Sequence, residues 1–277
     1  MLKRIARALL PRRVLGWIRV RRLHWAIQRY PTRVVRHNYG NGELSVYLSD
    51  GLAGGWYDHD WPDLPEIARL RQHRLRPGAR VFDVGAHQGV VAMMLAREVG
   101  PTGRVVAIEP SEHNVVAARK NVELNGMTQL TVVHAAVLDT SGPVTFNQGA
   151  NAQMDDGTAH WGRNEVRGVT ADELAAEFGL PDVMFVDVEG CECRVLDGAR
   201  TILSHRIDWF VEVHVGCGLE TLGGSVDRVL AYFPSSQYDI LINRADGDGF
   251  RPPVPNDPIL KERFHLLAIA RNLPDPS

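Results

Sequence analysis

Two acidic residues follow apolar segments at positions suited to holding a nucleotide-like ligand. Asp83 opens the loop Asp-Val-Gly-Ala-His-Gln-Gly, and Glu109 ends the apolar run Val-Val-Ala-Ile-Glu. Gly85 and Gly89 let the backbone turn tightly and approach a ligand, and the helix start that follows offers free N–H groups. A carboxylate at position 83 repels a phosphate and attracts an ammonium group, whereas Glu109 can accept both hydroxyls of a ribose.

S-adenosylmethionine matches this combination, since it carries an ammonium group and two ribose hydroxyls but no phosphate. The glycine spacing also differs from the Gly-x-Gly-x-x-Gly pattern of dinucleotide-binding folds, because His87 stands where the second glycine would be. An ordinary tight turn is the competing interpretation of the glycine loop alone. Together with Glu109, the loop predicts an S-adenosylmethionine site.

Two further pairs of ionisable residues could carry the chemistry. Asp187 and Glu189 are two residues apart, as are Glu212 and His214, so each pair shares one side of an extended strand. Methyl transfer needs mainly proximity and orientation, but a sugar hydroxyl also needs a general base or a metal that lowers its pKa. We expect His214 to be a metal-free base, oriented by Asp187 or Glu189.

Other roles for these residues stay open. A divalent metal held by Asp187, Glu189 and His214 is the less favoured alternative. His214 could also be a buried structural histidine, and Glu189 could stabilise the start of the next helix.

A regular alternation of apolar strands and amphipathic helices must position these groups. It predicts strands over residues 80–84, 105–108, 130–135, 183–188, 209–213, 238–243 and 265–270. It predicts helices over residues 90–99, 114–124, 170–178, 192–203 and 225–233, the third with Thr170 and Glu173 as a capping box. This alternation is typical of a mostly parallel sheet covered by helices on both faces. Ligands of such sheets bind beyond the carboxyl ends of the strands.

The N-terminal part of the chain has a different character. Residues 1–40 carry eleven Lys and Arg and no acid, which leaves 20 basic and 33 acidic residues in the remainder. We expect a basic amphipathic arm there, followed by a lead-in over residues 41–77 with a strand at 44–48, a loop at 51–61 and a helix at 64–75. Trp56, Tyr57 and Trp61 in that loop could cover an acceptor or fix the N-terminal segment to the core.

A long polar segment, residues 147–168, separates two core elements. Loops of this length in compact domains are often lids or binding loops. Trp161, beside His160 and Arg163, could stack on a sugar face, and a flexible connector is the competing interpretation.

Composition narrows the class of protein. The 277 residues are 44% hydrophobic and 23% charged, which suits one large α/β domain or two small ones. The three cysteines have neither zinc spacing nor the number for a disulfide framework, as in a reduced cytoplasmic protein. No apolar run approaches the roughly 20 residues of a membrane span, and Pro11 shortens the apolar start of the chain. We expect no transmembrane helix and no cleaved signal.

Six motifs occur in an order that resembles a known family. They are Asp-Val-Gly-Ala-His-Gln-Gly (83–89), Val-Val-Ala-Ile-Glu-Pro (105–110), Asn-Val-Glu-Leu-Asn-Gly (121–126), Val-His-Ala-Ala-Val-Leu-Asp (133–139), Val-Thr-Ala-Asp-Glu-Leu (169–174) and Phe-Val-Asp-Val-Glu-Gly (185–190). Over about residues 78–215 the sequence is similar to the FkbM family of S-adenosylmethionine-dependent methyltransferases. The resemblance implies the class I methyltransferase fold, an α/β Rossmann-like seven-stranded sheet with an antiparallel last strand. It also implies methylation of hydroxyl groups of sugars, glycolipids and macrolides.

The motif positions imply which residues hold the cofactor. Asp83, Gly85 and Gly89 would contact the methionyl part, Glu109 the ribose, and the loop at 135–137 the adenine. The full expected set is Asp83, Gly85, Ala86, His87, Gly89, Glu109, Ala135, Ala136 and Asp187. We expect Ser111 to cap the next helix instead of touching the cofactor.

The chain departs from the family pattern at two places. The family usually has Asn-Ile where this chain has His87 and Gln88, so it stays open whether His87 takes over the asparagine contact. Cys191 and Glu192 replace Ala-Glu, a mild change because cysteine is small and tolerates burial.

We therefore expect an O-methyltransferase that modifies a hydroxyl of a sugar, glycolipid or polyketide-like acceptor. A nicotinamide-dependent oxidoreductase is the second hypothesis, weakened by His87 and by the lack of a Tyr-x-x-x-Lys motif. A non-catalytic binding protein with the cofactor fold is the third. The expected parts are the arm at 1–40, the lead-in at 41–77 and the methyltransferase domain at 78–277.

The basic arm suggests where the enzyme works. A short Arg-rich amphipathic helix suits peripheral contact with an anionic membrane face, so residues 1–30 would bring a cytoplasmic enzyme to the inner membrane and to a lipid-linked glycan acceptor. A solvated or dimer-packing helix is the alternative. We expect no nucleic-acid partner, and the sequence leaves the oligomeric state open.

Overall fold

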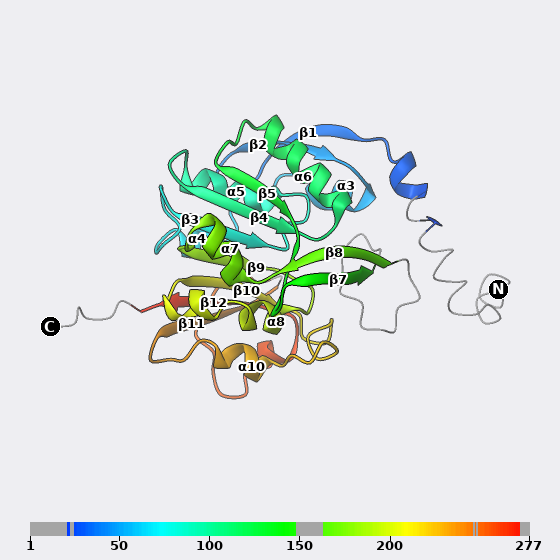
Figure 1. Ribbon diagram of the computed structural model, residues 1–277. Coiled ribbons are helices and arrows are strands. Elements are labelled where there is room, and N and C mark those ends of the chain that lie inside the picture. Colours follow the sequence, from blue (N-terminus) through cyan, green and yellow to red (C-terminus); the bar gives the residue numbers. More distant parts are fainter. Residues whose placement is uncertain (1–20, 23–24, 148–162, 246, 248, 272–277) are drawn as a thin grey trace, which may run out of the picture.

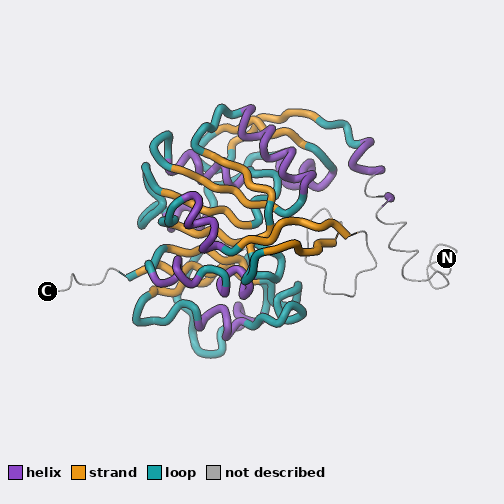
Figure 2. The backbone as a smooth tube through the Cα atoms, viewed as in Figure 1, coloured by secondary structure: helices purple, strands orange, loops and turns teal. Residues whose placement is uncertain are grey.

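A mostly parallel seven-stranded sheet forms the centre of the protein. The computed structural model describes residues 21–22, 25–147, 163–245, 247 and 249–271. The sheet order is β11 (Tyr238–Arg244), β12 (Phe264–Ala270), β10 (Asp208–Val213), β9 (Val183–Val186), β3 (Arg80–Val84), β4 (Arg104–Glu109) and β5 (Leu130–His134). The strands from β10 to β5 are parallel, and β12 is antiparallel to both of its neighbours. Figures 1 and 2 show these strands running through the middle of the molecule.

Helices cover both faces of this sheet and form a separate hydrophobic core on each. One core joins the sheet to α7 (Ala171–Phe178), α8 (Glu192–Asp197), α9 (Arg200–Ser204) and α10 (Val226–Ala231). The other joins it to α3 (Gly51–Tyr57), α4 (Pro65–Leu70) and α5 (Val90–Val99). Helix α6 (Glu112–Leu124) packs beside β5 and β2 (Glu43–Leu48). The central strands are apolar on both sides because both faces are covered.

The alternation expected from the sequence is present, with local differences. The capping box at Thr170 is confirmed. The helix expected over 192–203 is divided into α8 and α9 at Gly198, where a Cβ atom would lie 2.1 Å from the carbonyl oxygen of Leu138. The strand expected over 183–188 ends at Val186, and the chain then leaves the extended conformation, with a positive φ at Glu189 and Gly190.

The lead-in contains a helix where a loop was expected. Strands β1 (Arg33–Asn38) and β2 form a hairpin, and residues 51–57 then form α3. The expectation of a loop was wrong because Asp50 caps this helix: its Oδ1 atom accepts hydrogen bonds of 2.8 Å from the N–H groups of Leu52 and Ala53. The helix expected over 64–75 is shorter and spans α4 only.

A smaller sheet follows β5, and it carries the long polar segment. Its order is β6 (Ala136–Val137), β8 (Arg163–Val169) and β7 (Gly142–Asn147), and Figure 1 shows β7 and β8 extending away from the main sheet. Part of the segment expected as a loop is thus strand β8. His160, Trp161 and most of the basic arm lie outside the described residues. A short 3₁₀ helix, η1 (Pro258–Lys261), precedes β12. No helix of the described chain has the length and apolar character to cross a membrane.

Candidate functional site

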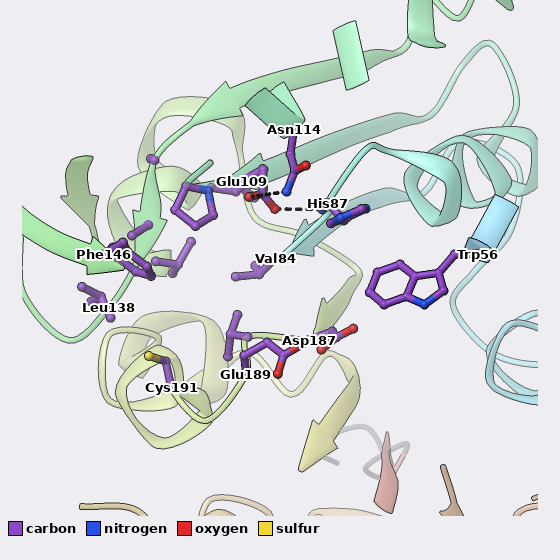
Figure 3. A pocket seen from close by; sticks show the side chains of 17 residues that line it. Trp56, Val84, His87, Glu109, Asn114, Leu138, Phe146, Asp187, Glu189 and Cys191 are labelled. Atoms are coloured by element: carbon purple, nitrogen blue, oxygen red, sulfur yellow. Dashed lines mark hydrogen bonds between the residues drawn. The ribbon is translucent and has the colours of Figure 1, made fainter. Parts of the chain in front are cut away.

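A cleft lies at the carboxyl ends of β3, β4 and β9. Six of the expected cofactor residues line it: Gly85, His87, Glu109, Ala135, Ala136 and Asp187. Asp83, Ala86 and Gly89 are not among its lining residues. Figure 3 shows Glu109 and His87 on one side and Asp187 and Glu189 on the other. It also shows Leu138 and Phe146 at one end and Trp56 at the other, with Asp187 and Glu189 between them.

The glycine loop after β3 is fixed by a close backbone approach. Gly85 has a φ of +91°, and a Cβ atom there would lie 1.7 Å from the carbonyl oxygen of Asp187. Gly89 has a φ of +81°, and its Cβ would lie 3.2 Å from the Cβ of Ala118 on α6. The absence of a side chain at Gly85 therefore lets the end of β3 contact the segment after β9.

Glu109 fastens the glycine loop to the end of β4. Its carboxylate accepts hydrogen bonds from the backbone N–H groups of His87 (2.9 Å) and Ser111 (2.8 Å) and from the side chain of Asn114 (3.3 Å). A carboxylate has about four acceptor positions, so one remains for a ligand hydroxyl. Burial raises the pKa of Glu109 to about 7 although these hydrogen bonds lower it. Ser111 does stand at the N-cap of α6, but its side chain makes no capping hydrogen bond.

Asp83 is a buried carboxylate with an unsatisfied oxygen. Its exposed fraction is 2%, and its Oδ2 atom has no hydrogen-bond partner among the described residues. Burial, together with the charge of Glu109, raises the pKa of Asp83 to about 7. A buried acceptor without a donor is costly, so this oxygen favours a cationic donor in the adjoining cleft.

His87 connects the glycine loop to the lead-in. Its Nδ1 atom lies 2.8 Å from the hydroxyl of Tyr57, and its ring centroid lies 5.1 Å from that of Trp56. Burial lowers the pKa of His87 to about 4, so the ring is neutral at pH 7. Tyr57 and Trp61 pack together inside the lead-in, whereas Trp56 lines the cleft with 41% of its surface exposed. Tyr57 and Trp61 thus fix the lead-in to the core, and Trp56 is the aromatic residue of the three that lines the cleft.

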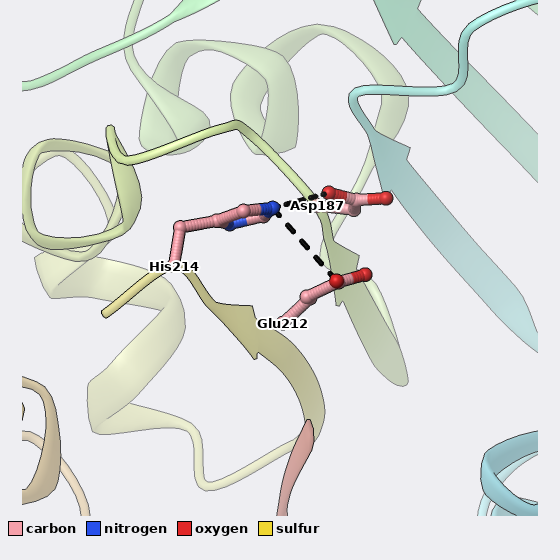
Figure 4. Close-up of side chains that lie close together, drawn as sticks. All are labelled: Asp187, Glu212 and His214. Atoms are coloured by element: carbon pink, nitrogen blue, oxygen red, sulfur yellow. Dashed lines mark ion pairs between the residues drawn. The ribbon is translucent and has the colours of Figure 1, made fainter. Parts of the chain in front are cut away.

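The structure brings the four ionisable residues of the expected chemistry together at the ends of β9 and β10. His214 is 1% exposed, and its Nε2 atom lies 3.6 Å from Asp187 Oδ1, 3.7 Å from Glu189 Oε2 and 3.8 Å from Glu212 Oε1. Figure 4 shows the imidazole ring aimed at Asp187 and Glu212. The side chain of Asp187 is 43% exposed and lines the cleft, so the cluster is open to the space where a cofactor would lie.

A fourth carboxylate, Glu192, completes this cluster and was missed as a functional residue in the sequence. It is fully buried at the start of α8, and its Oε1 atom lies 2.6 Å from Nδ1 of His214 and accepts the N–H of Gly190 at 3.0 Å. An acidic residue in a first helical turn ordinarily indicates only a favourable interaction with the helix dipole. The available signal in the sequence was its place between Cys191 and Cys193, because cysteine is among the most often buried residue types.

Neighbouring charges determine the protonation of the cluster. Burial lowers the pKa of His214, but the hydrogen bond to Glu192 and the charges of Glu192, Asp187 and Glu212 outweigh it and raise that pKa to about 9. Desolvation in the cleft and the charge of Glu212 raise the pKa of Asp187 well above its usual range, although part of its side chain stays exposed.

The structure changes one ligand of the metal site that the sequence offered as an alternative. Among the described residues, Asp187, Glu212 and His214 each offer one ligand atom within 4.8 Å of the others. The set expected from the sequence had Glu189 in place of Glu212. Glu189 remains adjacent, with its carboxylate 3.7 Å from His214 Nε2.

A family model and two curated proteins match parts of this sequence. The family model described as "Methyltransferase FkbM domain" matches residues 83–240. The ribosomal protein L11 methyltransferase of Pelotomaculum thermopropionicum is 35% identical over 99 residues, 35% of this chain and 31% of that protein. That of Symbiobacterium thermophilum is 36% identical over 86 residues, 31% of this chain and 27% of that protein. The matched part of the chain thus spans about 30% of the length of these curated relatives.

Solved structures show likeness at lower identity. The region matched to a methyltransferase FkbM from Methylobacillus flagellatus KT covers 69% of this chain and 43% of that chain, with 18% identity and a TM-score of 0.46. The region matched to an O-methyltransferase from Bacillus cereus in complex with SAH covers 74% of this chain and 80% of that chain, with 13% identity and a TM-score of 0.44.

Proposed function

The chain belongs to the FkbM methyltransferase family, and from this premise we propose that it methylates a hydroxyl group of a sugar, glycolipid or polyketide-like acceptor. It is an S-adenosylmethionine-dependent methyltransferase. The observation that carries the oxygen acceptor is the cluster around His214, which lies at the same cleft as the expected cofactor residues. A hydroxyl is a poor nucleophile, and such a cluster can remove or weaken its proton.

The cleft suggests how the cofactor lies. The adenine would occupy the apolar end, against Ala135, Ala136 and Phe146, and a ribose hydroxyl would donate to the remaining acceptor position of Glu109. The unsatisfied oxygen of Asp83 would attract the methionyl ammonium group. This orientation would direct the sulfonium methyl away from Phe146, toward Asp187 and Trp56.

The proposed reaction is an in-line displacement. The acceptor oxygen forms a bond to the methyl carbon, the carbon–sulfur bond breaks, and sulfur keeps the electron pair, giving S-adenosylhomocysteine. The hydroxyl proton passes to the cluster of Asp187, Glu189 and His214. With a pKa of about 9, His214 is neutral in only about one molecule in a hundred at pH 7 in the ligand-free protein, which weakens it as a metal-free base.

Trp56 is the proposed acceptor platform. Its indole is partly exposed at the end of the cleft where the methyl group would point, across from Asp187 (Figure 3). An exposed aromatic face suits the apolar face of a sugar ring, because it supplies rigid contact area at small entropic cost.

We also propose that the basic arm holds the enzyme at an anionic membrane surface, near a lipid-linked acceptor. The charge pattern of residues 1–40 supports this, with eleven basic residues and no acid. Deletion of residues 1–30 should abolish sedimentation with anionic liposomes and leave S-adenosylhomocysteine binding unchanged. Equal sedimentation of both forms contradicts the membrane proposal alone.

A ligand-dependent unfolding experiment tests the function. S-adenosylhomocysteine at 100 times its Kd should stabilise the protein by about 2.7 kcal/mol, and NAD should not. Transfer of labelled methyl from S-adenosylmethionine to a panel of hydroxyl acceptors follows, with the product bond assigned by NMR. Stabilisation by NAD alone contradicts the proposal. Methylation at nitrogen or carbon only contradicts its oxygen specificity, and cofactor binding without any turnover favours a binding protein.

A further inference from the structure

We propose that Asp187, Glu212 and His214 bind one divalent cation at the acceptor end of the cleft. The inference rests on the proposed function, since the cation would act on the acceptor hydroxyl at that same site. The three residues come from neighbouring elements, Asp187 from the end of β9 and the other two from the end of β10 (Figure 4).

The spacing of the ligand atoms fits a cation better than direct hydrogen bonds. His214 Nε2 lies 3.6 Å from Asp187 Oδ1 and 3.8 Å from Glu212 Oε1, beyond the roughly 3.2 Å limit of a good hydrogen bond. Ligand atoms about 2.0–2.2 Å from a common metal ion would be separated by about 3–4.4 Å. Both distances from His214 Nε2 fall in this range, and the ligand atoms of Asp187 and Glu212 lie within 4.8 Å of each other.

The opposite nitrogen of the same ring shows that this spacing is not caused by a loosely placed side chain. Nδ1 of His214 lies 2.6 Å from Oε1 of Glu192, which is itself held by the N–H of Gly190. His214 is almost completely buried, and its Nε2 atom faces carboxylate oxygens of Asp187, Glu189 and Glu212 at 3.6–3.8 Å. A metal-binding histidine commonly donates its other ring N–H to a carboxylate, which directs the free lone pair at the metal. Glu192 has that position.

The charged side chains around the cluster are compatible with a bound cation. Glu189 Oε2 lies 3.7 Å from His214 Nε2. Two basic side chains beside the cluster contact Glu212, Arg263 with its Nε atom 3.2 Å from Oε1 and His265 with its Nε2 atom 3.6 Å from Oε2. A bound cation would replace the proton that His214 carries in the metal-free protein. Arg263 is half exposed and can turn outward. A divalent ion would balance the remaining carboxylate charge, and the exposed face of Asp187 leaves a coordination position open to the cleft.

The ligand types indicate the kind of metal. One imidazole and two carboxylates suit a divalent transition ion such as Mn²⁺, because Mg²⁺ and Ca²⁺ prefer oxygen ligands throughout. When bound, such an ion lowers the pKa of a hydroxyl that reaches it. Asp187, Glu212 and His214 would hold the ion, while Glu192 is a positioning residue that fixes the ring of His214.

Binding of Mn²⁺ to the full chain tests the site without an activity measurement. The purified protein is stripped with EDTA, dialysed and titrated with Mn²⁺, and the free ion is followed by its EPR signal. We expect one bound Mn²⁺ per chain. Asp187→Asn and His214→Ala should weaken binding at least about a hundredfold, and Glu192→Gln should weaken it about 10- to 100-fold. Glu123→Gln, which removes an exposed carboxylate on α6, is the matched control and should bind as the unmodified chain.

The possible outcomes test the cation site separately from the proposed methyl transfer. Thermal unfolding of each variant shows whether it is folded. If His214→Ala does not fold, Asp187→Asn alone tests the site, because it keeps the shape of the side chain. If the stripped protein binds no Mn²⁺, or if Asp187→Asn binds it as tightly as the unmodified chain, the cation site is wrong. If the protein still methylates a hydroxyl in the presence of EDTA, the cation site is wrong and the proposed function stands. Stoichiometric Mn²⁺ binding that Asp187→Asn removes supports the site, whatever the acceptor is.

Discussion

The carbonyl oxygen of Asp187 lies 1.7 Å from the point that a Cβ atom on Gly85 would occupy. The glycine loop after β3 and the carboxylate-bearing segment after β9 therefore share one packing contact. The N–H of Asp187 also donates to the carbonyl of Val84, directly before this glycine. The cofactor loop and the proposed catalytic cluster are thus positioned by the same few backbone atoms.

Gly85→Ala should destabilise the protein and disrupt its cofactor site. The new Cβ would collide with backbone that cannot rotate away, and alanine is strained at a φ of +91°. We expect a loss of at least about 3 kcal/mol in the free energy of unfolding and at least tenfold weaker S-adenosylhomocysteine binding, measured by urea denaturation and calorimetry. Gly126→Ala is the control, because its φ of +61° adds strain but a Cβ there meets nothing within 4 Å. Equal effects of the two substitutions would contradict the packing argument.

The positions of Asp83 and Glu109 could be inferred from the sequence because local pattern alone determines them. Continuous apolar runs predicted β3 and β4, and an acid at the end of each strand of a parallel sheet must lie at the ligand edge. The helix α3 could not be inferred in this way. Its three glycines each disfavour a helix by about 1 kcal/mol, and only the cap from Asp50 and the burial of Tyr57 outweigh them.

The roles of Glu192 and Trp56 could not be inferred from the sequence, because they depend on contacts between distant parts of the chain. Glu192 becomes part of the cluster only because β10 places His214 against the start of α8, a contact between residues 22 positions apart. Trp56 lines the cleft where α3 meets the glycine loop, through contacts of Trp56 and of Tyr57, the next residue, with His87, which is about 30 positions away. Periodicity within one element carries no information about either contact.

Binding of S-adenosylmethionine should weaken as the pH falls below 7. Burial raises the pKa of both Asp83 and Glu109 to about 7 in the ligand-free protein. Only the ionised forms attract the ammonium group and accept from the ribose, so protons compete with the cofactor below that pH. From pH 8 to pH 6 each group should weaken binding about tenfold, measured by calorimetry.

Asp83→Asn is the control for this pH dependence. It removes one titrating carboxylate, so its affinity at pH 8 should be lower but should fall less steeply toward pH 6. The amino group of the cofactor has an ordinary pKa of about 8 and gains charge as the pH falls, so its own titration would strengthen binding instead. An affinity that rises between pH 8 and pH 6 would therefore refute the role of these carboxylates.

Trp56→Ala should impair acceptor binding and spare the cofactor. The indole lines the cleft at the end opposite Leu138 and Phe146, where the acceptor would approach (Figure 3). Loss of a stacking aromatic is worth about 1–1.5 kcal/mol, so the KM for a sugar acceptor should rise about tenfold while the Kd of S-adenosylhomocysteine changes less than twofold. Trp25→Ala removes another exposed tryptophan, which does not line the cleft, and should change neither constant. An unchanged acceptor KM in Trp56→Ala would exclude the platform.

Glu192→Ala should destabilise the protein far more than Glu192→Gln. Alanine leaves Nδ1 of the buried His214 and the N–H of Gly190 without their acceptor, and each unsatisfied donor costs about 1–3 kcal/mol. Glutamine keeps an oxygen for both donors and removes only the charge. We expect a loss of about 2–5 kcal/mol for Glu192→Ala and under about 2 kcal/mol for Glu192→Gln, measured by urea denaturation at pH 7. If the two variants unfold at the same urea concentration, Glu192 contributes through its charge alone, and the hydrogen bond to His214 does not set the ring position.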